Sequence, residues 1–114
     1  MSAGERMRRV DAAVRQVVGD AVAQDLQDPR VGFVTVTDVK TSPDLRHARV
    51  YVSVLGTPAE REASLEGLRS AHGFLQGRVA RELRLKNTPE LDFILDDTAE
   101  KAFRLEKLLE EDEG

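Results

Sequence analysis

Apolar residues in the first part of the chain recur at steps of three and four, which places them in one stripe along a helix. The stripe consists of Val10, Val14, Val17, Val18, Ala21 and Val22. This pattern predicts an amphipathic helix over residues 6–26. Asp28-Pro29 is expected to end it, because the residue before a proline is pushed out of the helical region of backbone conformations.

The period then changes to two, which is typical of strands with one covered face. The alternating apolar positions of residues 48–55 are Ala48, Val50, Val52 and Val54. Residues 33–40 predict a partner strand, and a bulge is expected at Asp38-Val39, where the alternation is blurred. Pro43 and Asp44 lie between the two strands and favour a turn, so an antiparallel hairpin is predicted.

Helical spacing returns over residues 60–86. Its apolar stripe is Leu65, Leu68, Leu75, Val79 and Leu83. One straight helix of that length would span roughly 40 Å, which exceeds the ~30 Å width of a small domain. Glycine is unfavourable inside a helix, so we expect an interruption at Ala71-His72-Gly73 that keeps the domain compact.

The last two elements are shorter. Leu91, Phe93 and Leu95 alternate as a third strand, and the spacing of Ala102, Leu105 and Leu109 suggests a final helix. The complete order predicts a single α+β domain over residues 1–114, in which a three-stranded sheet carries helices on one face. Its acidic end, at about 110–114, is expected to be flexible.

The composition fits a folded domain and limits the chemistry. Of the 114 residues, 40% are hydrophobic and 33% are charged, and no apolar run reaches the roughly 20 residues of a membrane helix. The chain has no cysteine, so we expect neither disulfides nor thiolate metal sites, and a cytoplasmic location. The two histidines, His47 and His72, are isolated, so no metal site is predicted.

The net charge of −4 argues at first against a nucleic-acid partner, but the charge is unevenly distributed. Residues 96–114 carry a net charge of −5, and the rest of the chain carries +1. Residues 69–86 alone carry +4. Because salt screens charges over about 8 Å, local charge decides where a polyanion binds. A basic patch is therefore compatible with this acidic chain.

The second half of the interrupted helix is expected to present that patch. Arg78, Arg81 and Arg84 fall opposite its apolar stripe at 100° per residue. Such arginines are either ordinary solvated residues or phosphate ligands, since the guanidinium group matches phosphate oxygens. Backbone N–H groups at the helix restart after Gly73 would add a second anion-binding element. Phe74 lies near this sector, and of two roles, covering the core or stacking on a base, the core role is favoured.

Further basic residues crowd the start of the first helix. Arg6, Arg8 and Arg9 oppose the helix dipole there, so local helix stability does not explain them. They are either solvated at a frayed terminus or in contact with an anionic partner.

Catalytic chemistry is not predicted. Ser42, Asp44 and His47 share one turn, but Ser-Pro-Asp is common turn chemistry and no other reactive group converges on it. The glycines match neither the phosphate loop of nucleotide hydrolases nor the dinucleotide fingerprint. We therefore expect a binding protein without a catalytic residue, cofactor or small-molecule substrate.

Several segments, in order, resemble the bacterial ribosome-binding factor A family. The most specific are AspProArgValGly at 28–32, ValThrValThrAspVal at 34–39 and SerProAspLeuArgHisAlaArgValTyrValSerValLeuGly at 42–56. Ser-Ala-His-Gly-Phe at 70–74, Arg84-Leu85 and Thr-Pro-Glu-Leu at 88–91 continue the likeness, which covers about residues 6–109. The resemblance implies a type II KH-like fold, in which Ala-x-Gly at Ala71–Gly73 replaces the Gly-x-x-Gly loop of ordinary KH domains.

The same resemblance implies a monomeric, non-enzymatic assembly factor. It would bind the free immature 30S subunit and its 16S rRNA, support late maturation of the 16S rRNA 5′ end, and matter for growth in the cold. The candidate RNA contacts are Arg78, Arg81, Arg84, Lys86, Ala71, His72, Gly73, Arg6, Arg8, Arg9, Arg46 and His47. Two alternatives remain: a protein–protein adapter whose arginine face pairs with an acidic partner, and a small hydrolase using Asp44 and His47.

Overall fold

The computed structural model describes residues 2–98 and 105–110. Its elements are α1 (Ala3–Asp20), a π-helical extension η1 (Ala21–Asp25), β1 (Val34–Thr41), β2 (His47–Val54), α2 (Pro58–Ser70), α3 (His72–Leu83) and β3 (Glu90–Leu95). This order confirms the predicted one. Residues 105–110 are helical, but Ala102 of the expected final helix and residues 111–114 of the acidic end lie outside the described residues.

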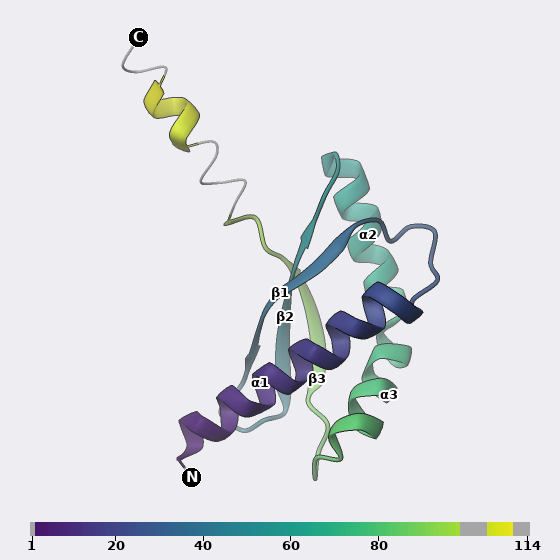
Figure 1. Ribbon diagram of the computed structural model, residues 1–114, viewed down its shortest axis with the longest axis vertical. Helices are drawn as coiled ribbons and strands as arrows, with labels where there is room; N and C mark the ends of the chain where they lie inside the picture. The colour runs from purple at the N-terminus through teal and green to yellow at the C-terminus, as the bar shows by residue number, and fades with distance from the viewer. Residues whose placement is uncertain (1, 99–104, 111–114) are drawn as a thin grey trace.

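The sheet has the order β1-β2-β3 (Figure 1). β1 and β2 form the predicted antiparallel hairpin, whereas β3 lies parallel to β2. A parallel neighbour needs a crossover connection, and α2 with α3 supplies it. The register of the hairpin shifts between Val36 and Asp38, which leaves Thr37 as the extra residue. The bulge therefore precedes the predicted position, Asp38-Val39, and the alternation resumes at Asp38.

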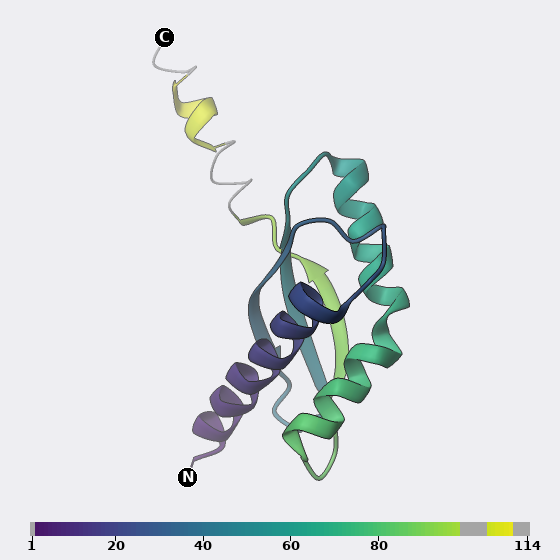
Figure 2. The same ribbon diagram turned by 45° about the vertical axis from the view of Figure 1, so that its right-hand side comes forward.

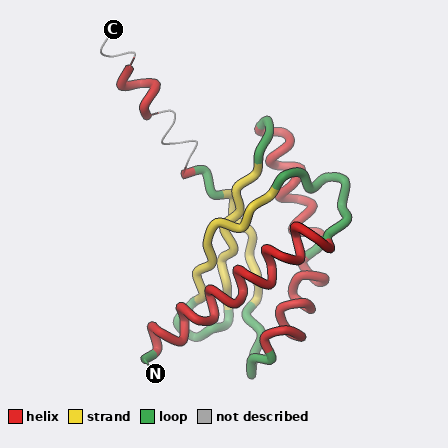
Figure 3. Tube along the Cα trace, viewed as in Figure 1, coloured by secondary structure: helices red, strands yellow, loops and turns green. Residues whose placement is uncertain are grey.

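All three helices cover the same face of the sheet, as predicted (Figure 3). α1 crosses this face diagonally, while α2 and α3 run along its side (Figure 2). The strands contribute Val36, Val39, Ala48, Val50, Val52, Val54, Leu91 and Phe93 to the core, and the helices contribute Val14, Val18, Leu65, Leu68, Leu75 and Val79. No helix in the described part of the chain has the length and apolar character needed to cross a membrane.

The loop at residues 28–32 is attached to α2. The Gly32 N–H donates to Ser64 Oγ at 3.1 Å, and the Ser64 hydroxyl donates to the Arg30 carbonyl at 3.2 Å. Gly67 of α2 lets the loop approach closely, because a Cβ at this position would lie 2.6 Å from Val31 Cγ2. Within the loop, side-chain and backbone hydrogen bonds from Arg30 lower the pKa of Asp28. The segment that carried the family likeness therefore fixes α1 and β1 relative to α2.

The predicted interruption lies between α2 and α3, at Ala71 and not at the glycine. Ala71 is the residue between the two helices, with φ −86° and ψ 9°. Gly73 is the second residue of α3 and does not adopt a positive φ. A Cβ at Gly73 would meet no atom within 4 Å. The bend instead accompanies the packing of Leu68 and Leu75, one from each helix, into the core.

α3 ends at Leu83, before the predicted end at residue 86. Arg84 terminates it in the left-handed conformation, with φ 48° and ψ 40°. Gln76 then fixes the return to β3: its Nε2 donates to the Pro89 carbonyl at 2.7 Å, and its Oε1 accepts from the Leu91 N–H at 3.1 Å. The first half of α3 and the start of β3 are therefore held together.

Candidate nucleic-acid interface

Three segments that are distant in sequence lie at the same end of the molecule: residues 3–10 of α1, turn 42–47, and residues 81–90 around the α3–β3 loop (Figure 1, Figure 2). We call this region the basic end. Its basic residues are Arg6, Arg8, Arg9, Arg46, His47, Arg81, Arg84 and Lys86. Its acidic residues are Glu5, Asp44, Glu82 and Glu90, so its formal net charge is +3 with neutral histidine. The basic end thus differs in sign from the whole chain, which carries −4.

Hydrogen bonds between elements hold the basic end in place. Asp11 of α1 accepts from the N–H of Thr41, at 2.8 Å, and from its hydroxyl. The Glu90 N–H donates to the Arg46 carbonyl at 2.8 Å, which joins β3 to the hairpin turn. These bonds fix α1 and the hairpin turn to the sheet next to the cations that they carry.

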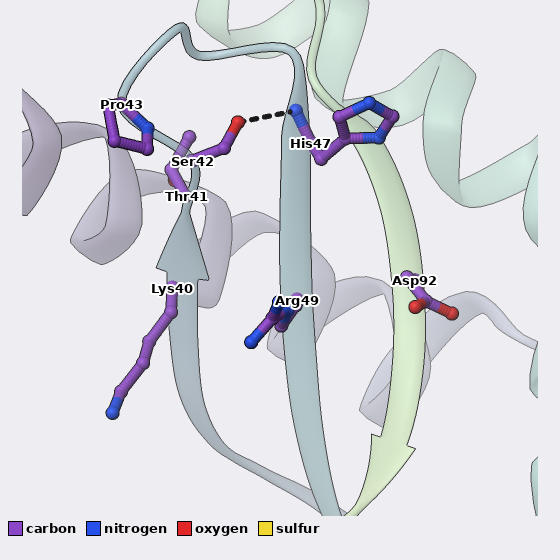
Figure 4. Close-up of a pocket in the computed structure, with 7 residues that line it drawn as sticks. All are labelled: Lys40, Thr41, Ser42, Pro43, His47, Arg49 and Asp92. Atoms are coloured by element: carbon purple, nitrogen blue, oxygen red, sulfur yellow. Dashed lines mark hydrogen bonds between the residues drawn. The ribbon is translucent and has the colours of Figure 1, made fainter.

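The hairpin turn is closed by Ser42, Asp44 and His47, the three residues that the sequence analysis considered for catalysis. The Ser42 hydroxyl donates to Asp44 Oδ1 at 2.6 Å and accepts from the His47 backbone N–H at 3.1 Å. Two hydrogen bonds lower the pKa of Asp44: the larger effect comes from the Ser42 hydroxyl, and the smaller comes from the Arg46 N–H. In Figure 4 the His47 ring points away from Ser42. These contacts are those of a turn, as the sequence interpretation favoured, and they form no Ser–His relay.

Arg78 does not face solvent together with Arg81 and Arg84, although the helical wheel predicted that all three would. Its Nη2 lies 2.8 Å from Asp25 Oδ2, and its Nη1 lies 3.6 Å from Glu82 Oε1. The side chain is only 22% exposed, and its guanidinium carbon lies 5.4 Å from the centroid of the Phe74 ring. Asp25 follows α1, so Arg78 joins the end of that helix to α3. The expectation that it faces solvent was wrong because the wheel contains no information about Asp25.

The preferred role of Phe74 was also wrong. Its side chain is 42% exposed, so it does not cover the core at the bend. Its ring instead lies beside the Arg78 guanidinium at a distance where a cation–π interaction operates.

Arg81, Arg84 and Lys86 are exposed. Among the described residues, none of them has a carboxylate within ion-pair distance. Arg84 is the residue that follows the last residue of α3, and its backbone is left-handed. The direction of its side chain therefore follows from this backbone conformation and not from helical periodicity. The arginine surface therefore lies around the C-terminal end of α3 and not along its whole length.

The bend is separated from this surface. Ala71, His72 and Gly73 lie at the N-terminal end of α3, whereas Arg84 and Lys86 follow its C-terminal end. A helix of this length spans roughly 18 Å. His72 is half-buried, Gly73 is exposed, and Ala71 gives α3 no side-chain cap. The candidate residues thus form two groups, the basic end and the bend.

The mixed β1-β2-β3 sheet, covered on one face by α1 and the α2–α3 pair, defines an α+β domain with the type II KH-like arrangement. Residues 6–109 match the sequence profile of the family described as Ribosome-binding factor A. The chain belongs to the ribosome-binding factor A family.

Curated and solved relatives agree with this assignment. The chain is 48% identical over 112 residues to ribosome-binding factor A of Anaeromyxobacter sp. (strain Fw109-5), covering 97% of this chain and 92% of that one. The crystal structure of ribosome-binding factor A from Thermus thermophilus superimposes with a TM-score of 0.69 and 28% identity, covering 78% of this chain and 94% of that one.

One further solved structure and one homology model that was fitted into a map extend the likeness. The solution structure of a Thermotoga maritima candidate ribosome-binding factor A gives a TM-score of 0.71 and 38% identity, covering 82% of this chain and 90% of that one. Coordinates of Thermus thermophilus ribosome-binding factor A, fitted into an electron-microscopy map of a complex with the 30S subunit, give a TM-score of 0.64 and 29% identity. They cover 75% of this chain and 90% of that one.

Proposed function

We propose that this protein is a non-enzymatic assembly factor that binds the immature small ribosomal subunit through its RNA. Membership of the ribosome-binding factor A family supports the ribosomal partner, as does the relative that was fitted into a 30S complex. The observation that carries the proposal is the placement of three distant segments at one end of the molecule, where they form a basic end of charge +3 on a chain of charge −4.

In the proposed contact, Arg81, Arg84 and Lys86 bind RNA phosphates. They are exposed and have no ion-pair partner among the described residues, so they reach phosphate without breaking an internal contact. Arg6, Arg8 and Arg9 extend the contact from α1, and Arg46 and His47 extend it from the hairpin turn. Arg78 contributes less directly, because it positions α3 through Asp25.

The bend is proposed as a second point of contact. Gly73 leaves open space where a side chain would stand, so an RNA backbone has room to approach the first turn of α3. Ala71 offers no competing side-chain cap, and His72 lies beside it. The N–H groups of that turn are donors that suit an anion.

The proposed role is to hold one conformation of the subunit RNA during late maturation, including maturation of the 16S rRNA 5′ end. A factor achieves this by binding that conformation more tightly than its competitors, which shifts the population toward it. No bond needs to be made or broken by the protein itself.

Sedimentation with immature and mature small subunits at several salt concentrations tests this proposal. Each phosphate contact that is lost should reduce the log–log dependence of affinity on salt by about one. Arg81→Ala/Lys86→Ala should therefore flatten the slope by about two and leave thermal stability nearly unchanged. Arg78→Ala removes one positive charge too, and should lower the unfolding temperature while changing the slope less than Arg81→Ala.

The outcomes separate the alternatives. Unchanged binding of Arg81→Ala/Lys86→Ala would remove the assignment of the basic end. A much shallower salt slope for the wild type would favour an adapter for an acidic protein, because protein carboxylates lack the condensed counterions that RNA releases. Failure of the wild type to bind small subunits would refute the function.

A further inference from the structure

The face of the sheet opposite the helices carries a row of charged side chains. Lys40 of β1 is paired with Arg49 of β2, and Arg49 is paired with Asp92 of β3. All three are exposed. Together with turn residues they line a concavity of about 460 Å³, and the described residues that line it are Lys40, Thr41, Ser42, Pro43, His47, Arg49 and Asp92 (Figure 4). The sequence pattern placed Arg49 on the polar side of its strand but did not single it out, because the pairing with Lys40 depends on the hairpin register.

The fold does not explain this row. Like charges directly opposite each other weaken an antiparallel pair, and Lys40 faces Arg49 in that way. Among the described residues, neither cation has a carboxylate within ion-pair distance, and Asp92 has no cation within that distance. In Figure 4 Lys40 leans away from Arg49 along β1, and Asp92 stands apart on the neighbouring strand. Three charged groups are thus exposed in one row without satisfying one another.

The combination of charges indicates the ligand. Lysine and arginine bind phosphate oxygens, whereas a carboxylate accepts hydrogen bonds and repels phosphate. A ribonucleotide presents both partners, because its phosphate is an anion and its ribose 2′-hydroxyl is a donor. An acidic peptide would also satisfy Lys40 and Arg49, and Asp92 repels its carboxylates as it repels phosphate, but only a ribonucleotide places a hydroxyl donor beside every phosphate. The row therefore fits RNA better than an acidic protein.

We propose that this concavity binds one nucleotide of an RNA strand, with Lys40 and Arg49 on its phosphate and Asp92 on its 2′-hydroxyl. The inference rests on the proposed RNA-binding function and extends it to the uncovered sheet face. The position supports one continuous path, because Ser42, Pro43 and His47 belong both to this lining and to turn 42–47 of the basic end. Asp92 distinguishes RNA from DNA, which lacks the 2′-hydroxyl.

Two substitutions separate the phosphate role of Arg49 from the 2′-hydroxyl role of Asp92. The affinity of each variant is measured for a short single-stranded RNA of mixed sequence and for DNA of the same sequence. Arg49→Ala should reduce the salt slope by about one for both strands, because it removes a phosphate contact. Asp92→Asn should bring the ratio of RNA affinity to DNA affinity toward one without reducing the slope. Thr35→Glu is the control: it alters the net charge as Arg49→Ala does, at an exposed position toward the other end of β1.

Thermal unfolding must first show that the variants fold, as expected for exposed side chains. An unchanged slope in Arg49→Ala would overturn the phosphate role. Equal tightening of RNA and DNA by Asp92→Asn would show that Asp92 only repels the backbone, which would overturn the ribose role. Sedimentation with small subunits tests this inference separately from the proposed function on which it rests. If wild-type and Arg49→Ala proteins bind subunits with equal salt slopes, the subsite is refuted and the proposed function stands; if neither binds, both fail.

Discussion

The two halves of the interrupted helix have nearly the same length, but their stabilising contacts differ. α2 begins with a capping box in which Thr57 and Glu60 satisfy each other's backbone N–H groups, and Ser64 fixes it to the loop at 28–32. α3 begins at Ala71 without a side-chain cap and ends in the left-handed conformation at Arg84. Both helices bury apolar residues in the core, but only α2 has a side-chain cap at its start, whereas the start of α3 has no such cap.

Glycine has opposite meanings in these two helices. At Gly67 in α2, the Cβ of any other residue would lie 2.6 Å from Val31 Cγ2. At Gly73 and Gly77 in α3, a Cβ would meet no atom within 4 Å. Glycine is thus required by packing in α2, whereas in α3 it only lowers helix stability unless a ligand uses the open space. The same residue type marks an internal contact in one half and a free surface in the other.

The largest effect is expected from Gly67→Ala. The new methyl group overlaps a β-branched side chain that cannot rotate away freely, so the loop must move. We expect the free energy of unfolding to fall by about 1–3 kcal/mol, measured by urea denaturation. Gly77→Ala is the matched control and should not destabilise the protein. Val31→Ala should restore part of the loss in the double variant, and independent, additive effects would contradict the contact.

Gln76→Ala is expected to have the next largest effect. It leaves the Pro89 carbonyl and the Leu91 N–H without the partner that joins α3 to β3. The loss should be about 1–2 kcal/mol in the free energy of unfolding, with faster hydrogen exchange at Leu91. Gln16→Ala removes only an exposed bond to Asp20, so its effect should stay within about 0.5 kcal/mol. Equal effects of the two exchanges would show that α3 is not fixed through Gln76.

The smallest effect is expected from Gly73→Ala, and its sign is opposite. Residue 73 is already helical and has space for a methyl group, so the exchange should stabilise the protein by about 0.5–1 kcal/mol. Circular dichroism should show no additional helix, because the bend is at Ala71. If the open space serves RNA, the same variant should bind small subunits more weakly despite its greater stability. A destabilised Gly73→Ala would contradict the open, helical environment of this residue.

Periodicity was sufficient to predict the scaffold. The stripes of α1 and of the α2–α3 pair, and the alternation from Ala48 to Val54, predicted the element order, the hairpin and the covered face of the sheet. These features depend on neighbours in sequence, which a single chain displays directly. The interruption near residue 71 was also predicted, because it follows from the length of the pattern.

The side-chain partners could not be predicted in the same way. Arg78 meets Asp25, and Gly67 meets Val31, through contacts between segments that are distant in sequence. Likewise, Lys40 and Arg49 become neighbours only once the hairpin register is set. Arg84 was misplaced because helical periodicity was extended past the true end of α3 at Leu83. The candidate site was therefore predicted as a set of residue types, while the structure determines which of them are available to a ligand.

The parallel pairing of β2 with β3 also has a kinetic consequence. The hairpin closes a short loop, but the other side of the central strand is completed only by residues that follow the entire α2–α3 crossover. Pairing across such a distance carries a larger loop-closure entropy, so β3 should join the sheet late in folding. Until then the backbone groups of β2 on that side remain unpaired, and a nascent chain that ends before Glu90 exposes them to other strands.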